Sequence, residues 1–190
     1  VVWAGNAAGD ADGIFAQQFN GAGGKEGPEF RVNTLTTGIQ SNPAIAMDTA
    51  GNFVVVWDGG TGGVAAQRYN AQGAAQGVEF PIGSGTSPDV AMDADGDFVV
   101  TWRGAGIVAR RYDAQGQPQG GQFTVPTSLL EQISSGPSIA TDDGGNFVFV
   151  WVSCITEGER ASLLPYETAV TVSNEARAAA EAREASIYTA

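Results

Sequence analysis

The sequence predicts an all-β protein, a β-propeller-like array of four-stranded antiparallel blades. Two internal repeats carry this prediction. One pattern runs from proline to tryptophan without gaps in three copies, at residues 43–57, 88–102 and 137–151. A second pattern follows it, in three copies at residues 13–32, 63–82 and 106–125. Strands alternate with short turn sequences throughout both, and no helical period occurs up to residue 152.

Each copy of the first pattern is predicted to form a hairpin, the first and second strands of a blade. Its loops lie at residues 48–52, 93–97 and 142–146, and each contains Asp, Gly and Asn or a further Asp. These residues suit a three- to five-residue hairpin loop, often a type I turn with a G1 bulge, because Gly and Asn tolerate positive φ. The strand at 53–57 is apolar at every position. Such a strand is expected to be buried on both faces.

Each copy of the second pattern supplies the third and fourth strands. The segments 64–69 and 107–112 mix polar and apolar residues, as expected nearer a sheet edge. A short fourth strand is predicted around Phe80 or Phe123. Four antiparallel strands with the apolar one inside match a propeller blade. Tryptophan ends every second strand, at intervals near the length of propeller repeats.

The repeats set the predicted boundaries. They give a partial blade at 1–35, blades at 36–83 and 84–126, and a partial blade at 127–152. The repeat stops there, and residues 153–190 form a divergent C-terminal segment. A strand is predicted at 169–172 and a helix at 174–186, because Ala, Glu and Arg are strong helix formers. This helix has no apolar stripe, so a solvated helix, a disordered tail and a partner-dependent element all remain open.

The motif Asp-x-x-Gly-Asn-Phe-Val-Val-Val-Trp, followed by Gly-Val-x-Ala-Gln-Arg-Tyr-Asn-Ala-Gln-Gly, resembles tandem repeats of very large secreted or surface proteins of bacteria. The resemblance covers residues 1 to about 152. It implies propeller blades, an extracellular location and a binding role of the adhesin- or toxin-associated kind, with no catalytic set.

Composition excludes several functional classes. The chain has 190 residues, 9 Lys plus Arg against 21 Asp plus Glu, and a net charge of -12, which is unfavourable for binding nucleic acid or anionic membranes. It has no His and one Cys, so His triads and internal disulfides are excluded. No apolar run is long enough to span a membrane. The first residues begin in mid-repeat and do not resemble a signal peptide, which suggests a processed product or a fragment.

One acidic loop is a candidate calcium site. Asp93, Asp95 and Asp97 alternate in a tight loop, and carboxylate oxygens are the ligands that calcium prefers. The simpler interpretation is a turn in which Asp caps its own backbone.

Two other groups of residues are weaker candidates. Acid–base chemistry of a glycosidase kind would have to use carboxylates of the variable loops, namely Asp10, Asp12, Asp58 and Glu131. The tryptophans are candidate sugar-stacking platforms, but their place at the end of an apolar strand favours core packing. Trp102 in particular is expected between two sheets.

The hairpin loops keep their length, whereas the other two links of each blade vary. All variation therefore lies on one face of the array, which is either a binding face or simply unconstrained. We expect a non-enzymatic extracellular structural or binding module that self-associates through open blade edges into a homo-oligomer or filament. Residues 169–172 are a candidate donated strand, and the competing outcome is that this segment folds back and completes the last blade of its own chain. A glycan or surface protein is a candidate partner, and a lectin-like propeller is the alternative.

Overall fold

In the computed structural model, residues 1–7, 10–59, 63–125, 132–133, 135–154 and 169–172 are described. All regular elements within these ranges are β-strands, and all their pairings are antiparallel. The prediction of an all-β protein is therefore confirmed. The predicted helix at 174–186 lies outside the described residues. No helix in the described part of the chain is long and apolar enough to cross a membrane.

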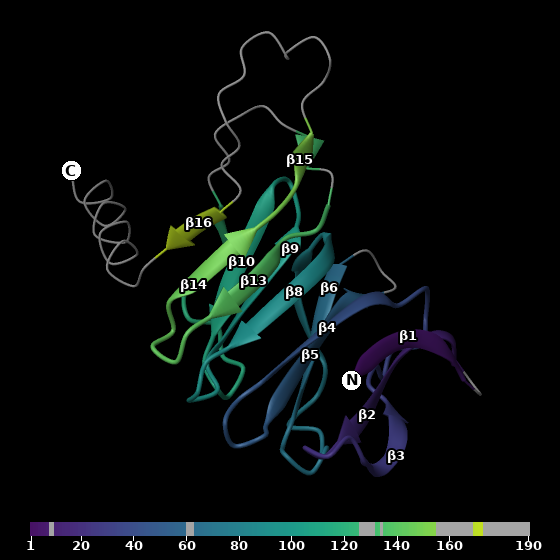
Figure 1. Ribbon diagram of the computed structural model, residues 1–190. Coiled ribbons are helices and arrows are strands. Elements are labelled where there is room, and N and C mark those ends of the chain that lie inside the picture. Colours follow the sequence, from purple (N-terminus) through teal and green to yellow (C-terminus); the bar gives the residue numbers. More distant parts are fainter. Residues whose placement is uncertain (8–9, 60–62, 126–131, 134, 155–168, 173–190) are drawn as a thin grey trace, which may run out of the picture.

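Four sheets correspond to the four predicted repeat units (Figure 1). The first sheet contains β1 (Val2–Ala7), β2 (Asp10–Phe19) and β3 (Lys25–Arg31). The second sheet contains β4 (Ser41–Met47), β5 (Phe53–Gly59), β6 (Gly63–Tyr69) and β7 (Phe80–Ser84). The third sheet contains β8 (Thr86–Met92), β9 (Phe98–Arg103), β10 (Ile107–Tyr112) and β11 (Phe123–Thr124). The fourth sheet contains β13 (Ser138–Thr141), β14 (Phe147–Val150) and β16 (Ala169–Val172). A small extra sheet pairs β12 (Gln132–Ile133) with β15 (Ser153–Cys154).

The four sheets stand in a row in chain order. Their leading strands are neighbours, since β1 contacts β4, β4 contacts β8, and β8 contacts β13. Figure 1 shows the row from β1–β3 at the right to β13, β14 and β16 at the left. The described sheets do not close into a barrel or a ring.

Strand β5 shows how the row is held together. Its residues Phe53, Val55 and Trp57 form a buried cluster with the first sheet. The alternate residues Val54 and Val56 form another cluster with the third sheet. Side chains of a strand point to opposite faces in turn, so β5 contributes to two cores at once. The expected burial of this strand on both faces is confirmed.

The hairpin loops have the predicted turn chemistry. Gly51, Gly96 and Gly145 have φ values of 87°, 91° and 74°. The N–H of each glycine donates to the carbonyl of the Asp three residues earlier, at 3.1–3.2 Å. That φ is accessible to glycine at little cost, so the three loops close their hairpins in the same way.

The last sheet is completed by residues from beyond the repeat. Residues 169–172 form a strand where the sequence predicts one, and β16 pairs with β14 of its own chain. Its pairing of Val172 with Phe147 corresponds to that of Tyr69 with Phe53 in the second sheet. Residues beyond the repeat therefore fill the third-strand position of the fourth sheet.

Candidate binding surfaces

The acidic loop at residues 93–97 uses its carboxylates to hold turns together. Asp93 Oδ1 accepts hydrogen bonds from the backbone N–H groups of Asp95 and Asp97, at 3.1 and 3.0 Å. Asp97 accepts from the Ala114 N–H at 3.0 Å and from Gln119 Nε2 at 3.1 Å. It thereby ties the hairpin loop to the following turn of the same sheet. Both carboxylates act as caps for backbone and side-chain donors.

No group of three or more His, Cys, Asp or Glu side chains in the described ranges is arranged to hold a metal ion. Asp93, Asp95 and Asp97 belong to those ranges, so their geometry favours the capping interpretation. Calcium binding at this loop stays a hypothesis. Burial raises the pKa of Asp93, two backbone hydrogen bonds lower it, and the neighbouring carboxylates raise it further.

Among the four acid–base candidates, Asp58 has a carboxylate that is held by hydrogen bonds from two neighbouring strands. It accepts hydrogen bonds from Asn42 Nδ2 at 2.6 Å and from the Ser87 N–H at 2.7 Å. Asn42 and Ser87 precede the prolines of β4 and β8 and have φ values of 49° and 55°. Asp58 thus supports two strained bulges on neighbouring sheets. Glu131 and the side chain of Asp10 lie outside the described parts, and Asp12 accepts the Gln40 N–H through its backbone carbonyl.

The tryptophans belong to the cores. Trp102 is 1% exposed, lies in the cluster between the second and third sheets, and donates from Nε1 to the Ser84 carbonyl at 3.0 Å. Its predicted burial is confirmed. Trp57 and Trp151 are buried in the same way, and Trp3 is half-buried beside Phe15. Trp57, Trp102 and Trp151 are therefore not available as sugar-stacking platforms.

Each sheet has two different apolar faces. We call the face toward the sheet earlier in the chain the preceding face, and the opposite one the following face. On preceding faces the second strand presents Phe53, Val55 and Trp57 or their equivalents, and the third strand presents Tyr69 or Tyr112. On following faces the second strand presents Val54 and Val56. Every internal interface joins one face of each kind.

Each outermost face of the row carries a large apolar side chain that is exposed. On the preceding face of the first sheet, Phe19 stands at the position of Tyr69 and is 43% exposed, against 5% for Tyr69. On the following face of the fourth sheet, Val150 stands at the position of Val56 and is 47% exposed, against 0%. Val1 and Val152 are also exposed at these two ends.

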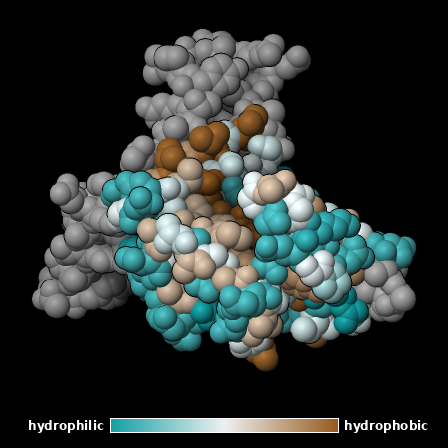
Figure 2. Space-filling view, turned by 60° about the horizontal axis from the view of Figure 1, so that its bottom comes forward, coloured by the Kyte–Doolittle hydropathy of each residue, from teal (hydrophilic) through white to brown (hydrophobic). Residues whose placement is uncertain are grey.

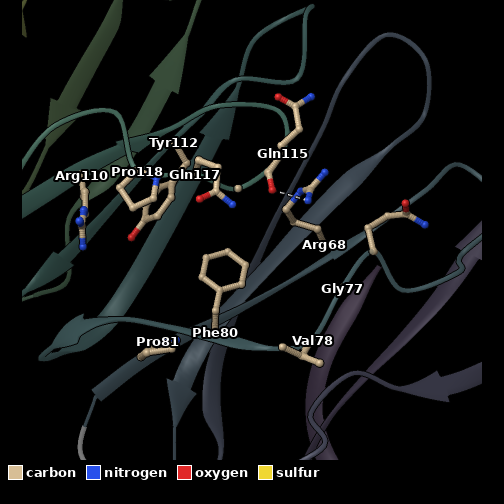
Figure 3. Close-up of a pocket in the computed structure, with 12 residues that line it drawn as sticks. Arg68, Gly77, Val78, Phe80, Pro81, Arg110, Tyr112, Gln115, Gln117 and Pro118 are labelled. Carbon is tan, nitrogen blue, oxygen red and sulfur yellow. Dashed lines mark hydrogen bonds between the residues drawn. The ribbon is translucent and has the colours of Figure 1, made fainter.

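A pocket of roughly 600 Å³ opens between the second and third sheets. It lies at the turns between third and fourth strands and not at the variable links, for which a binding face was one of two interpretations. Residues 76–78, 80 and 81 form one wall and residues 115–118 the other, with side chains of β6 and β10 between them. Figure 3 shows Phe80 and Pro81 opposite Tyr112, Gln117 and Pro118. On one face of the molecule as a whole, hydrophobic residues gather near the centre of a largely hydrophilic surface (Figure 2).

Two buried polar atoms of this pocket have no hydrogen-bond partner within 3.5 Å among the described residues: Arg110 Nε and the Tyr112 hydroxyl oxygen. The Arg110 guanidinium carbon lies 5.7 Å from the centre of the Tyr112 ring. Burial raises the pKa of Tyr112, and Arg110 opposes this shift, first through its positive charge and then as a side-chain hydrogen-bond donor to the hydroxyl. The hydroxyl therefore keeps its proton at neutral pH and can donate it in a hydrogen bond.

The equivalent residues of the neighbouring repeats are satisfied. Gln67 stands at the position of Arg110, and its Nε2 donates to the carbonyls of Arg68 and Gly77 at 2.9 and 3.4 Å. Tyr69 stands at the position of Tyr112, and its hydroxyl donates to the Val32 carbonyl at 3.3 Å. Burial also raises the pKa of Tyr69, to about 12. The unpaired donors are thus particular to the third sheet.

Arg68 is the second cation of the pocket. Its Nη1 donates to the Gln115 carbonyl at 2.6 Å and its Nη2 donates to the Ala114 carbonyl, so it bridges the two sheets. Burial lowers the pKa of Arg68, and the charge of Asp113 opposes this. An arginine remains protonated under such shifts.

Sequence reasoning missed this site, although one signal was visible. Arg110 replaces the glutamine that stands at its position in the other two copies, Gln17 and Gln67. Only the packing of the sheets shows that this change leaves two donors without partners. Comparison with known proteins adds no functional assignment: no family model and no curated protein matches the chain.

Proposed function

We propose that the chain is a non-enzymatic structural and binding module whose sheets are propeller blades, and that it associates with a second copy through its two outermost faces. The observation that carries this proposal is the exposure of Phe19 and Val150, because the equivalent residues between the second and third sheets, Tyr112 and Val56, are buried. Association would bury them as Tyr69 and Val56 are buried.

The blade interpretation is supported by several features of the row. The sheets are small and antiparallel, their leading strands are neighbours, and the apolar second strand is buried on both faces. Two copies would supply about eight sheets, the upper part of the range common in propellers. The joint is heterologous, so it either closes a ring or continues as a filament.

An extracellular location belongs to this proposal and is supported by the resemblance of the repeat to those of secreted and surface proteins of bacteria. The lectin-like alternative cannot use Trp57 or Trp102, because both are buried. Sugar recognition would need a different set of residues.

The test is a measurement of mass in solution, by sedimentation and native mass spectrometry, on the full chain at micromolar concentrations. We expect a concentration-dependent dimer or larger assembly. Phe19→Asp and Val150→Asp should each abolish it, because each places a charge in an apolar interface. Leu35→Asp is the matched control: Leu35 is also exposed and apolar but lies on a loop away from both end faces.

Mixing the two disabled variants separates this joint from unspecific aggregation. Phe19→Asp keeps an intact following face and Val150→Asp keeps an intact preceding face, so an equal mixture should form one-to-one pairs and nothing larger. A monomeric wild-type chain, or association that both substitutions leave intact, would contradict the proposal.

A further inference from the structure

The pocket between the second and third sheets combines positive charge with an absence of acidic side chains. Arg68 and Arg110 line it, and none of its described lining residues is Asp or Glu. This is unusual in a chain with 21 acidic and 9 basic residues. A site of that sign attracts an anionic group, and its effect is strengthened where water is partly excluded.

Arg110 and Tyr112 indicate where in the pocket an anionic group would bind. Tyr112 is 2% exposed and interacts with the Arg110 side chain, and neither its hydroxyl oxygen nor Arg110 Nε has a hydrogen-bond partner within 3.5 Å among the described residues. A buried donor without a partner costs free energy that a bound acceptor would recover. Figure 3 shows the polar ends of Arg110 and Tyr112 on the same side of the pocket. A planar carboxylate can accept from a guanidinium and a hydroxyl together.

The remaining lining residues suit a ligand whose uncharged part has both polar and apolar surfaces. Gln76, Gln115 and Gln117 carry amides that can donate as well as accept, as vicinal hydroxyl groups require. Phe80 and Pro81 offer an apolar wall of the opposite sheet. A volume of roughly 600 Å³ falls in the usual range of ligand pockets.

We propose that this pocket binds an acidic sugar, whose carboxylate accepts hydrogen bonds from the Arg110 guanidinium and the Tyr112 hydroxyl. The sugar hydroxyls pair with the glutamine amides, and the apolar face of the ring lies against Phe80 and Pro81. This site is separate from the outermost faces of the row, so its occupation does not depend on self-association.

The repeats themselves provide variants that fit the fold. Arg110→Gln introduces the residue found at this position in the other two copies, and Tyr112→Phe introduces the residue found in the first copy. Arg111→Gln removes the same charge as Arg110→Gln and likewise copies the first repeat, but Arg111 does not line the pocket. It is the matched control.

The experiment is titration calorimetry of the full chain with glucuronate, glucose, acetate and a glutamate dipeptide, with amide NMR shifts to locate the site. We expect glucuronate to bind more tightly than the other three and to shift amides at residues 76–81 and 110–118. Arg110→Gln should weaken glucuronate binding about tenfold or more, and Tyr112→Phe severalfold, as for hydrogen bonds to a charged group. Arg111→Gln should leave it unchanged, and added salt should weaken it.

Three outcomes would overturn the proposal. Equal binding of glucose would remove the role of the carboxylate, and equal or tighter binding of acetate or the dipeptide would remove the role of the sugar. Unchanged glucuronate affinity in Arg110→Gln, with the variant folded by its unaltered melting curve, would place the ligand elsewhere.

Discussion

At the scale of single residues, the first Asp of each hairpin loop shows how neighbours alter one structural role. Asp93 and Asp142 both cap their loops through Oδ1. Asp142 also accepts from Asn146 Nδ2, and its side-chain and backbone hydrogen bonds lower its pKa. Burial and two nearby carboxylates raise the pKa of Asp93. The same cap is therefore favourable when charged in one loop and less favourable in the other.

This difference predicts opposite responses to Asp→Asn substitution. A lowered pKa in the folded state gives stability that is present above the unfolded pKa and lost as pH falls through the folded one. A raised pKa in the folded state gives stability that is present below the unfolded pKa and lost as pH rises through the folded one. Ionised Asp93 therefore opposes folding at neutral pH. We expect Asp142→Asn to lower the melting temperature at pH 7 and Asp93→Asn to leave it unchanged or raise it. The difference in melting temperature between the two variants should shrink near pH 3, where both aspartates become protonated. Equal losses for both variants at pH 7 would contradict this interpretation.

The acidic loop also predicts the response to calcium. Because Asp93 and Asp97 are occupied by backbone and side-chain donors, we expect melting curves with calcium and with chelator to coincide. A chelator-sensitive melting temperature that Asp95→Ala abolishes would instead establish a calcium site.

Trp102 should be a major determinant of stability. Trp102→Ala should lower the free energy of unfolding by about 3–5 kcal/mol, as removal of a large buried side chain does. Gly83 makes room for this ring, since a Cβ there would lie 2.7 Å from Trp102 Cζ2. Gly83→Ala should cost about 1–3 kcal/mol through overpacking. Gly121→Ala, where a Cβ meets nothing within 4 Å, is the control for chemical denaturation. An equal effect of both glycine substitutions would contradict the close approach.

At the scale of elements, local chemistry explains which predictions succeed. Turn residues and strand periods are encoded within a few positions, so the hairpins and the buried strand β5 could be predicted. The partner of β16 stayed open between another chain and its own last sheet, because residues 169–172 lack the glutamine, arginine and tyrosine that mark β6. The pairing of that strand depends on the vacant side of β14, which is a property of the assembled sheet.

The role of β16 can be tested by truncation. A chain ending at residue 168 loses β16 and should lose protection from hydrogen exchange at residues 147–150, since β14 pairs with β16 there. A chain ending at residue 172 keeps the strand and is the matched control. Equal protection in both chains would show that β16 does not stabilise the fourth sheet.

At the scale of the whole molecule, the row of sheets predicts graded stability. Among the residues that the structure describes, the second and third sheets are packed on both faces, whereas the first and fourth are each packed on one. Amides of β5 and β9 should therefore exchange more slowly than those of β1 and β14, because opening an outer sheet disrupts one interface only. Uniform exchange rates across the four sheets would indicate a single cooperative unit.

The pocket, by contrast, could not be predicted at this scale from sequence, since the environment of Arg110 and Tyr112 depends on how two sheets meet.

The matching of preceding and following faces has a consequence for the gene. Since Val54 and Val56 of one repeat fit against Phe98, Val100 and Trp102 of the next, a duplicated copy of the coding segment would bring both halves of an interface with it. Unequal recombination between copies can therefore lengthen or shorten the protein by whole repeat units without any new complementary mutation. Substitutions such as that at Arg110 can then accumulate in one copy while its neighbours preserve the architecture.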